Sequence, residues 1–215
     1  MGKSIGMLVS FGILCVAAAC TESSQAAQSP KASSPSSTAV PVAAEETPLE
    51  KSSKLPNFEA AREFAKPFMT DVSNETSEGT RIFGAWALGH LKLSDVLVAK
   101  DETTFALVQK DPDEERGKRV CYGGTIVQIE VVKTPQGKGY EGILINQRRD
   151  LFRFLVAGST GALVGQSWGR VCGIVIGKYE YSNSGGGTGH AIQVVGMFDL
   201  PENRANDPLL AAPVQ

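Results

Sequence analysis

The 215-residue chain has few of the side chains on which catalytic and metal sites are most often built. It contains two histidines, His90 and His190, and four cysteines. No Cys-x-x-Cys pair is present, and neither histidine lies near Cys121 or Cys172 in the sequence. This argues against a zinc site or a dithiol redox site. We therefore predict no bound metal and no cofactor.

A serine nucleophile is not expected either. Ser182 and Ser184 precede His190 in a glycine-rich connector. No Gly-x-Ser-x-Gly motif surrounds these two serines, and a flexible connector does not preorganise a base and oxyanion donors. The same connector lacks the lysine and the following helix of a phosphate-binding loop. We predict no catalytic residue, and a hydrolase is the weakest of the alternatives.

The chain has no large excess of positive or of negative charge. The chain carries 21 basic and 23 acidic residues, for a net charge of −2. Removal of an N-terminal signal that contains Lys3 would leave 20 basic and 23 acidic residues, or −3. This balance argues against a surface for nucleic acid or acidic lipid. We therefore predict that nucleic acid is not a partner.

The first twenty residues have the pattern of a secretory signal. Lys3 is followed by an apolar run from Ile5 to Ala19, and small residues precede Cys20. A short positive start, a brief apolar core and small residues before the cut are typical of such signals. The run is shorter than the ~20 residues that a membrane span needs. An ordinary signal cut after Ala19 and a membrane anchor are the alternatives.

The Ala17-Ala18-Ala19-Cys20 end of this segment resembles the lipobox of bacterial lipoproteins. The resemblance implies a signal peptide over residues 1–19 and acyl chains on Cys20, which would hold the protein on a membrane. Thr21 stands where an inner-membrane retention signal would have aspartate. We therefore expect a cell-envelope protein that is lipid-anchored at the outer membrane.

Residues 20–54 are rich in Ser, Ala, Pro, Gln and Thr and contain no aromatic residue. Such a segment cannot bury enough apolar surface to offset its chain entropy. We expect a disordered tether after the lipidated cysteine, with a mean reach of about 30–35 Å. Residues 205–215 have a similar composition and are expected to be a flexible tail.

The remaining segment, residues 55–204, is long enough for one domain with its own core. Residues 55–116 favour helices. Asn57 can cap a helix whose apolar residues recur every three or four positions. A second apolar stretch contains Trp86, and Asp101 could cap a third helix. We expect this helical region to pack on the rest of the domain.

After Gly117 the apolar residues alternate in the manner of strands. Five strands are predicted, at residues 120–132, 142–146, 151–157, 171–181 and 190–199. The first and fourth have interior glycines that suit bulges or barrel corners, namely Gly123, Gly124, Gly173 and Gly177. The expected fold class is mainly β with an α-helical N-terminal part (α+β), and residues 117–204 are expected to form a small antiparallel barrel.

Three stretches of the chain resemble a group of bacterial exported OB-fold domains. They are residues 110–120, a charged approach that contains Gly-Lys before the first strand, Gly-Gly-Thr-Ile-Val-Gln-Ile at 123–129, and Gly-Arg-Val-Cys-Gly-Ile-Val-Ile-Gly at 169–177. The resemblance covers about half of the chain and implies a five-stranded, OB-fold-like antiparallel barrel. These positions shape the fold, and they imply no particular ligand.

Cys121 and Cys172 are the cysteines that remain once Cys15 leaves with the signal and Cys20 takes lipid. An oxidising compartment favours a disulfide between them. The OB-fold resemblance implies the same pairing, because the first strand of that fold lies beside the fourth. We expect a structural disulfide that contributes on the order of 4 kcal/mol in the chain-entropy model.

The connector between the last two strands lies where OB-folds commonly bind ligands, together with the face of the second and third strands. Aromatic side chains beside arginines suit stacking on a ligand. The resemblance therefore gives this candidate ligand-binding set: Arg148, Arg149, Phe152, Tyr179, Tyr181, Asn183 and His190. Arg153 and Phe154 are alternatives on the same strand, and half of the aromatic residues could instead belong to the core.

The leading hypothesis is a non-enzymatic, lipid-anchored module that binds an envelope partner or a small ligand. An envelope protein, a peptide or a glycan would suit such a face, and the N-terminal lipid would engage the membrane. The alternative is a structural or assembly lipoprotein that acts through residues 55–116.

Overall fold

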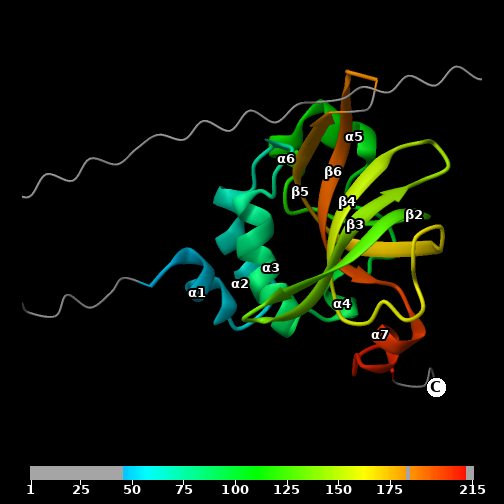
Figure 1. The fold of residues 1–215 in the computed structure, drawn as a ribbon. Coiled ribbons are helices and arrows are strands. Elements are labelled where there is room, and N and C mark those ends of the chain that lie inside the picture. Colours follow the sequence, from blue (N-terminus) through cyan, green and yellow to red (C-terminus); the bar gives the residue numbers. More distant parts are fainter. Residues whose placement is uncertain (1–45, 183–184, 212–215) are drawn as a thin grey trace, which may run out of the picture. The chain divides into compact units, whose positions relative to one another are not determined.

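The computed structural model describes residues 46–182 and 185–211 (Figure 1). The fold is that of the compact unit Ala44–Gln215. The predicted signal peptide, Cys20 and most of the predicted tether lie outside the described residues. The same holds for Asn183, Ser184 and residues 212–215.

The N-terminal helical region begins earlier than the sequence analysis predicted. Helix α1 (Pro48–Ser53) lies inside the predicted tether and starts with a capping box. The Thr47 hydroxyl accepts a hydrogen bond from the Glu50 amide, and the Glu50 carboxylate accepts one from the Thr47 amide. Ser52 is buried and donates its hydroxyl to the Ile82 carbonyl oxygen at 2.6 Å. Residues 48–53 are therefore part of the folded domain.

The next helices follow the sequence prediction more closely. Helix α2 (Phe58–Ala65) is capped by Asn57, whose side-chain oxygen accepts from the Ala60 amide. Pro67 lies in the short 3-10 helix η1 (Lys66–Phe68), which follows the end of α2, since proline cannot continue the hydrogen-bonding pattern of an α-helix. Helix α3 (Glu78–His90) contains Trp86, and α4 (Leu93–Val96) comes directly after it.

Asp101 does not cap a helix, in contrast to the prediction. Helix α5 (Phe105–Lys110) begins after Thr104, whose hydroxyl accepts from the Leu107 amide. The Asp101 carboxylate instead accepts the Cys121 amide at 2.8 Å. Helix α6 (Pro112–Glu115) leads into the first long strand, and α7 (Pro201–Ala205) follows the last one. Within the described ranges, no helix is long and apolar enough to cross a membrane.

Six strands of the described residues form one mixed sheet. They are β1 (Val72–Ser73), β2 (Arg119–Thr134), β3 (Gly137–Ile145), β4 (Leu151–Ala157), β5 (Trp168–Ser182) and β6 (Thr188–Phe198). Their order is β1-β5-β2-β3-β4-β6, and β5 also pairs with β6. The pairs β4–β6 and β1–β5 are parallel, and the other pairs are antiparallel.

The mainly β class with additional helices is confirmed. The five predicted strands correspond to β2–β6, and the strand predicted at 151–157 matches β4. The prediction of a purely antiparallel arrangement was wrong, because β4 and β6 run in the same direction. The sequence did not indicate β1, since two residues carry no recognisable alternation.

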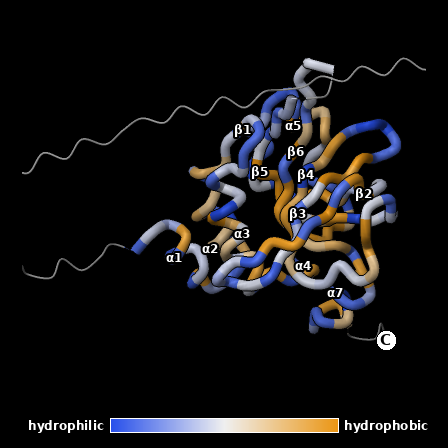
Figure 2. The backbone as a smooth tube through the Cα atoms, in the orientation of Figure 1, coloured by the Kyte–Doolittle hydropathy of each residue, from blue (hydrophilic) through white to orange (hydrophobic). Residues whose placement is uncertain are grey.

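Hydrophobic side chains gather in two clusters. One joins the helices to the sheet and contains Phe83 and Trp86 of α3 together with Ile174 of β5. The other lies among the strands, where the rings of Phe154 and Phe198 meet edge to face with centroids 5.3 Å apart. Figure 2 shows hydrophobic stretches in the strands and in α3, and a hydrophilic β3–β4 turn. The helical region therefore shares a core with the sheet.

Close backbone approach explains the interior glycines of β5. A Cβ on Gly173 would lie 2.4 Å from the Val195 carbonyl oxygen, and one on Gly177 would lie 2.8 Å from the Thr70 carbonyl oxygen. The register of β5 against β6 also shifts between Val175 and Gly177. The shift is the kind of irregularity that interior glycines predict.

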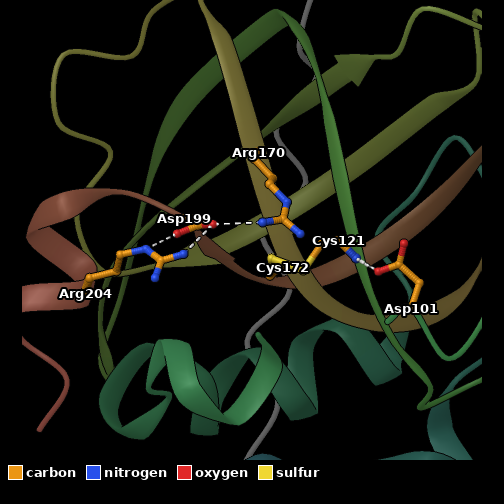
Figure 3. The surroundings of a disulfide bond; sticks show 6 residues. All are labelled: Asp101, Cys121, Arg170, Cys172, Asp199 and Arg204. Atoms are coloured by element: carbon orange, nitrogen blue, oxygen red, sulfur yellow. Dashed lines mark hydrogen bonds and ion pairs between the residues drawn. A yellow bond between two sulfur atoms is a disulfide. The ribbon is translucent and has the colours of Figure 1, made fainter. Parts of the chain in front are cut away.

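Cys121 and Cys172 form the predicted disulfide (Figure 3). They are directly opposed in the register of β2 and β5, with Cα atoms 4.0 Å apart, and both are buried. In the surroundings of this bond, the Asp199 carboxylate pairs with Arg170 and Arg204. The hydrogen bond from Arg204 lowers the pKa of Asp199 below its usual value, and the charge of Arg170 acts in the same direction.

Candidate ligand-binding site

Phe152 was predicted to lie on the ligand-binding face, and this prediction was wrong. The side chain is 2 % exposed and belongs to the core among the strands. Its ring stacks on Tyr122 with centroids 3.7 Å apart and meets the edge of Phe105 at 5.5 Å. Phe154, its alternative on the same strand, is equally buried. Both phenylalanines face inward because residues two apart on a strand share one face.

Arg148 and Arg149 are exposed in the turn between β3 and β4. Asn146 organises this turn, since its side-chain oxygen accepts from the amides of Arg148 and Asp150. The parallel pairing of Leu151 with Ala191 brings the turn to the end of the sheet at which β6 begins. The structure therefore places the two arginines at the end of the sheet at which β6 begins.

Tyr179, Tyr181 and His190 lie on the β5–β6 hairpin, and Asn183 lies outside the described residues. The two tyrosine rings stack with centroids 6.2 Å apart. Tyr181 covers Gly189 on the neighbouring strand, where a Cβ would come within 2.2 Å of the ring. His190 is exposed, with its Nδ1 3.4 Å from a Glu180 carboxylate oxygen.

Arg153 of β4 connects Tyr179 of β5 to residues 75–76, which precede α3. Its guanidinium lies over the Tyr179 ring at 4.6 Å from the centroid, a cation–π arrangement. The same group donates to the Glu75 carbonyl oxygen at 2.7 Å and to the Thr76 hydroxyl at 3.0 Å. The Glu141 carboxylate is 3.8 Å away. These contacts fix the guanidinium at one end of a cleft.

The cleft has a volume of about 350 Å³ and is lined by α1, α3, the β2–β3 hairpin, β4 and β6. We call Thr76, Thr80, Arg81, Glu141, Arg153 and Gln193 its polar end, and the β2–β3 hairpin adds Thr134 and Gln136 to the lining. Its apolar end is formed by Ala85, Leu88, Val132, Pro135 and Leu155. The sequence analysis did not predict this site, because its walls come from segments that are far apart in the chain.

The polar end is held together by hydrogen bonds and by strand register. Gln193 is buried, and its side-chain oxygen accepts from the hydroxyls of Ser77 and Thr80 at 2.9 and 3.1 Å. Arg153 lies opposite Gln193 in the β4–β6 register. Arg81 follows Thr80 on α3, is exposed, and has no ion pair among the described residues.

The apolar end depends on glycines that let α3 approach the sheet. A Cβ on Gly84 would lie 2.7 Å from a Leu155 methyl group, and one on Gly139 would lie 2.4 Å from a Leu88 methyl group. The helix therefore contacts the strands through aliphatic side chains. Val132 and Pro135 of the β2–β3 hairpin also line this part of the cleft.

A Gly-x-Ser-x-Gly pattern, which the sequence analysis missed, occurs at residues 165–169. In hydrolases with this motif the serine lies on a sharp turn between a strand and a helix. Ser167 instead precedes β5, where its hydroxyl accepts from the Val164 amide at 3.1 Å and its carbonyl oxygen from the Ile126 amide at 2.8 Å. The pattern therefore shapes a loop here and does not position a nucleophile.

Titratable groups near the strand core do not form a metal centre. Among residues 46–182 and 185–211, no group of three or more His, Cys, Asp or Glu side chains could hold a metal ion. Burial raises the pKa of Tyr122, whose hydroxyl has no hydrogen-bond partner in the part of the chain that the structure describes. His90 is exposed, its ring stacks on Trp86, and its Nε2 lies 3.0 Å from the Ser53 carbonyl oxygen.

No family model matches the chain, and no curated protein matches it. Among solved structures, it is similar to the mitochondrial single-stranded DNA-binding protein Rim1 of S. cerevisiae. The identity is 14 % and the TM-score 0.27, over 40 % of this chain and 94 % of that chain. We therefore correct the sequence-based prediction that excluded nucleic acid, because a similar solved chain binds single-stranded DNA. At this TM-score the similarity assigns no ligand.

Proposed function

We propose that this protein is a lipid-anchored lipoprotein of the cell envelope, attached to the outer membrane through Cys20. The lipobox-like residues 17–20 support this proposal. The Cys121–Cys172 disulfide supports it as well, because disulfides persist in oxidising compartments outside the cytoplasm. The intact mass of protein purified from its own membranes should equal residues 20–215 plus acyl chains. An unmodified chain that starts at another residue would contradict the anchor.

In this proposal β2–β6 form an OB-fold-like barrel. The support is the pairing of the five strands, which runs from β5 through β2, β3, β4 and β6 and back to β5. A five-stranded barrel with Greek-key connections has such a closed path. The long β2 and β5 have register shifts at residues 126–128 and 175–177, where coiled strands need to bend.

The domain binds a small apolar ligand in the cleft and does not catalyse a reaction on it. The observation that carries this function is the composition of the cleft. It combines largely aliphatic walls with a small number of polar and charged groups, and its volume of about 350 Å³ lies in the range of small-molecule sites. The alternative, an assembly role for residues 55–116, has less support. The apolar faces of Phe58, Phe83 and Trp86 are already buried in the core.

Binding of an uncharged fluorescent probe, N-phenyl-1-naphthylamine, tests this function. Val132→Trp places an indole in the cleft and should abolish most of the fluorescence gain. Val131→Trp is the matched control, because adjacent strand residues point to opposite faces and Val131 is 52 % exposed. Equal probe binding by the two variants would exclude the cleft as the site.

A further inference from the structure

We propose that the cleft takes a single-chain amphiphile with an anionic head group, a fatty acid carboxylate. The inference rests on the proposed function, since it names the ligand class of the same cleft. The head group would lie at the polar end, beside Arg81 and Arg153. The hydrocarbon chain would extend along α3 to the apolar end.

The charges at the polar end favour an anion. Arg81 and Arg153 contribute two positive charges, and Glu141 contributes one negative charge. The Glu141 carboxylate lies 3.8 Å from the Arg153 guanidinium, so the uncompensated charge is that of Arg81. A guanidinium presents planar donors that match a carboxylate. Arg153 is held in place by Glu75 and Thr76, so a carboxylate meets a positive charge that is already oriented.

The apolar end favours one hydrocarbon chain. Leu88, Val132 and Leu155 offer aliphatic surface, and Glu141 is a charged group beside it, opposite Leu155 in the β3–β4 register. A volume of about 350 Å³ lies at the lower limit of small-molecule pockets. A single chain of medium length therefore fits this volume, whereas the two acyl chains of a phospholipid exceed it. The ligand is thus a free fatty acid.

Isothermal titration calorimetry tests the head-group preference. The full chain with Cys20→Ser is exported to an oxidising compartment, so that no attached lipid competes for the cleft. Decanoate, 1-decanol and decyltrimethylammonium are titrated below the concentrations at which they aggregate. Decanoate should bind one to one and about 3- to 10-fold more tightly than decanol. The cationic amphiphile should bind more weakly than both.

Two arginine variants distinguish the cleft from general surface charge. Arg81→Gln should reduce decanoate affinity about 3- to 10-fold and leave decanol affinity unchanged, whereas Arg81→Lys should retain most of the decanoate affinity. Arg148→Gln removes an exposed arginine that does not line the cleft and should change neither affinity. Both glutamine variants keep the fold, because the two side chains are exposed.

The outcomes separate this inference from the function on which it rests. Equal affinities for decanoate and decanol, or an Arg81→Gln variant without effect, would overturn the anionic head group and leave the apolar site intact. If decanoate, decanol and the uncharged probe all fail to bind, the inference and the proposed function both fall. Tight binding of a two-chain phosphatidylglycerol vesicle without binding of decanoate would also overturn the fatty acid assignment.

Discussion

The surroundings of the disulfide and the walls of the cleft differ in how fully their groups are partnered. Beside Cys121 and Cys172, the Asp199 carboxylate accepts hydrogen bonds from two arginines and the strands are joined covalently. In the cleft, aliphatic side chains line open space and Arg81 has no ion pair among the described residues. One sheet thus has a region in which contacts stabilise the fold and another in which surface stays available for a ligand.

The comparison predicts that changes near the disulfide lower stability, whereas changes in the cleft lower binding. The largest effect is expected from the double variant Cys121→Ala, Cys172→Ala. The disulfide joins residues 51 apart in sequence, so its loss should cost about 3–4 kcal/mol of unfolding free energy. Urea denaturation measures the loss, and binding of the uncharged probe to the folded variant should persist. A loss below about 1 kcal/mol would mean that the other contacts already hold β2 on β5.

A smaller loss is expected at the polar end of the cleft, where stability and binding should change together. Gln193→Leu removes the buried acceptor of two hydroxyl groups and should cost about 2 kcal/mol. Decanoate affinity should fall as well, because the Thr80 hydroxyl loses its acceptor on Gln193 and keeps only Ser77 as a partner. Gln136→Leu, at the hairpin tip of the same cleft, is the control and should stay within about 0.5 kcal/mol of the unaltered protein.

The third prediction concerns pH near the disulfide. The folded-state pKa of Asp199 lies below its usual value of 3.8. The ion pairs therefore stabilise the fold at higher pH, and this stabilisation is lost as the pH falls through the lowered pKa. Asp199→Asn should cost about 1 kcal/mol at neutral pH and should flatten this acid-side loss. Thermal melts of the unaltered protein and the Asp199→Asn variant from pH 7 down to pH 2.5 would measure this difference. If both proteins lose stability in parallel as the pH falls, Asp199 is not the group responsible for the loss.

The smallest effect is expected on the hairpin that carries the sequence-predicted residues. His190→Gln removes a solvent-exposed contact with Glu180 and should change stability by less than about 0.5 kcal/mol. Binding of the uncharged probe and of decanoate should be unchanged. A clear loss of binding would move the ligand site from the cleft to the β5–β6 hairpin.

Local signals in the sequence predicted local structure well. Asn57 caps α2, and the alternation of apolar residues located β2–β6. The pairing of Cys121 with Cys172 followed from compartment and fold together. Helix α1 was missed although Thr47 and Glu50 have the spacing of a capping box, because the composition of the surrounding residues indicated disorder.

Features that depend on distant parts of the chain could not be predicted in the same way. The parallel pairing of β4 with β6 is set by the path of the chain around the sheet. Phe152 and Arg153 are neighbours on opposite faces of β4, and the register of the strand in the sheet decides that one is buried and the other reaches the cleft. The cleft itself combines α3, a hairpin and two strands, and no short motif encodes such a combination.

Because Cys121 and Cys172 are directly opposed, formation of their disulfide reports when β2 and β5 pair during folding. The two sulfur atoms meet only when β2 and β5 lie side by side, a pairing between segments that are distant in the chain and therefore slow to find each other. Trapping free thiols at successive times during refolding would report when this pairing is complete. In an oxidising compartment, the disulfide would thus form as soon as β2 has paired with β5, and it would distinguish chains in which this pairing is complete.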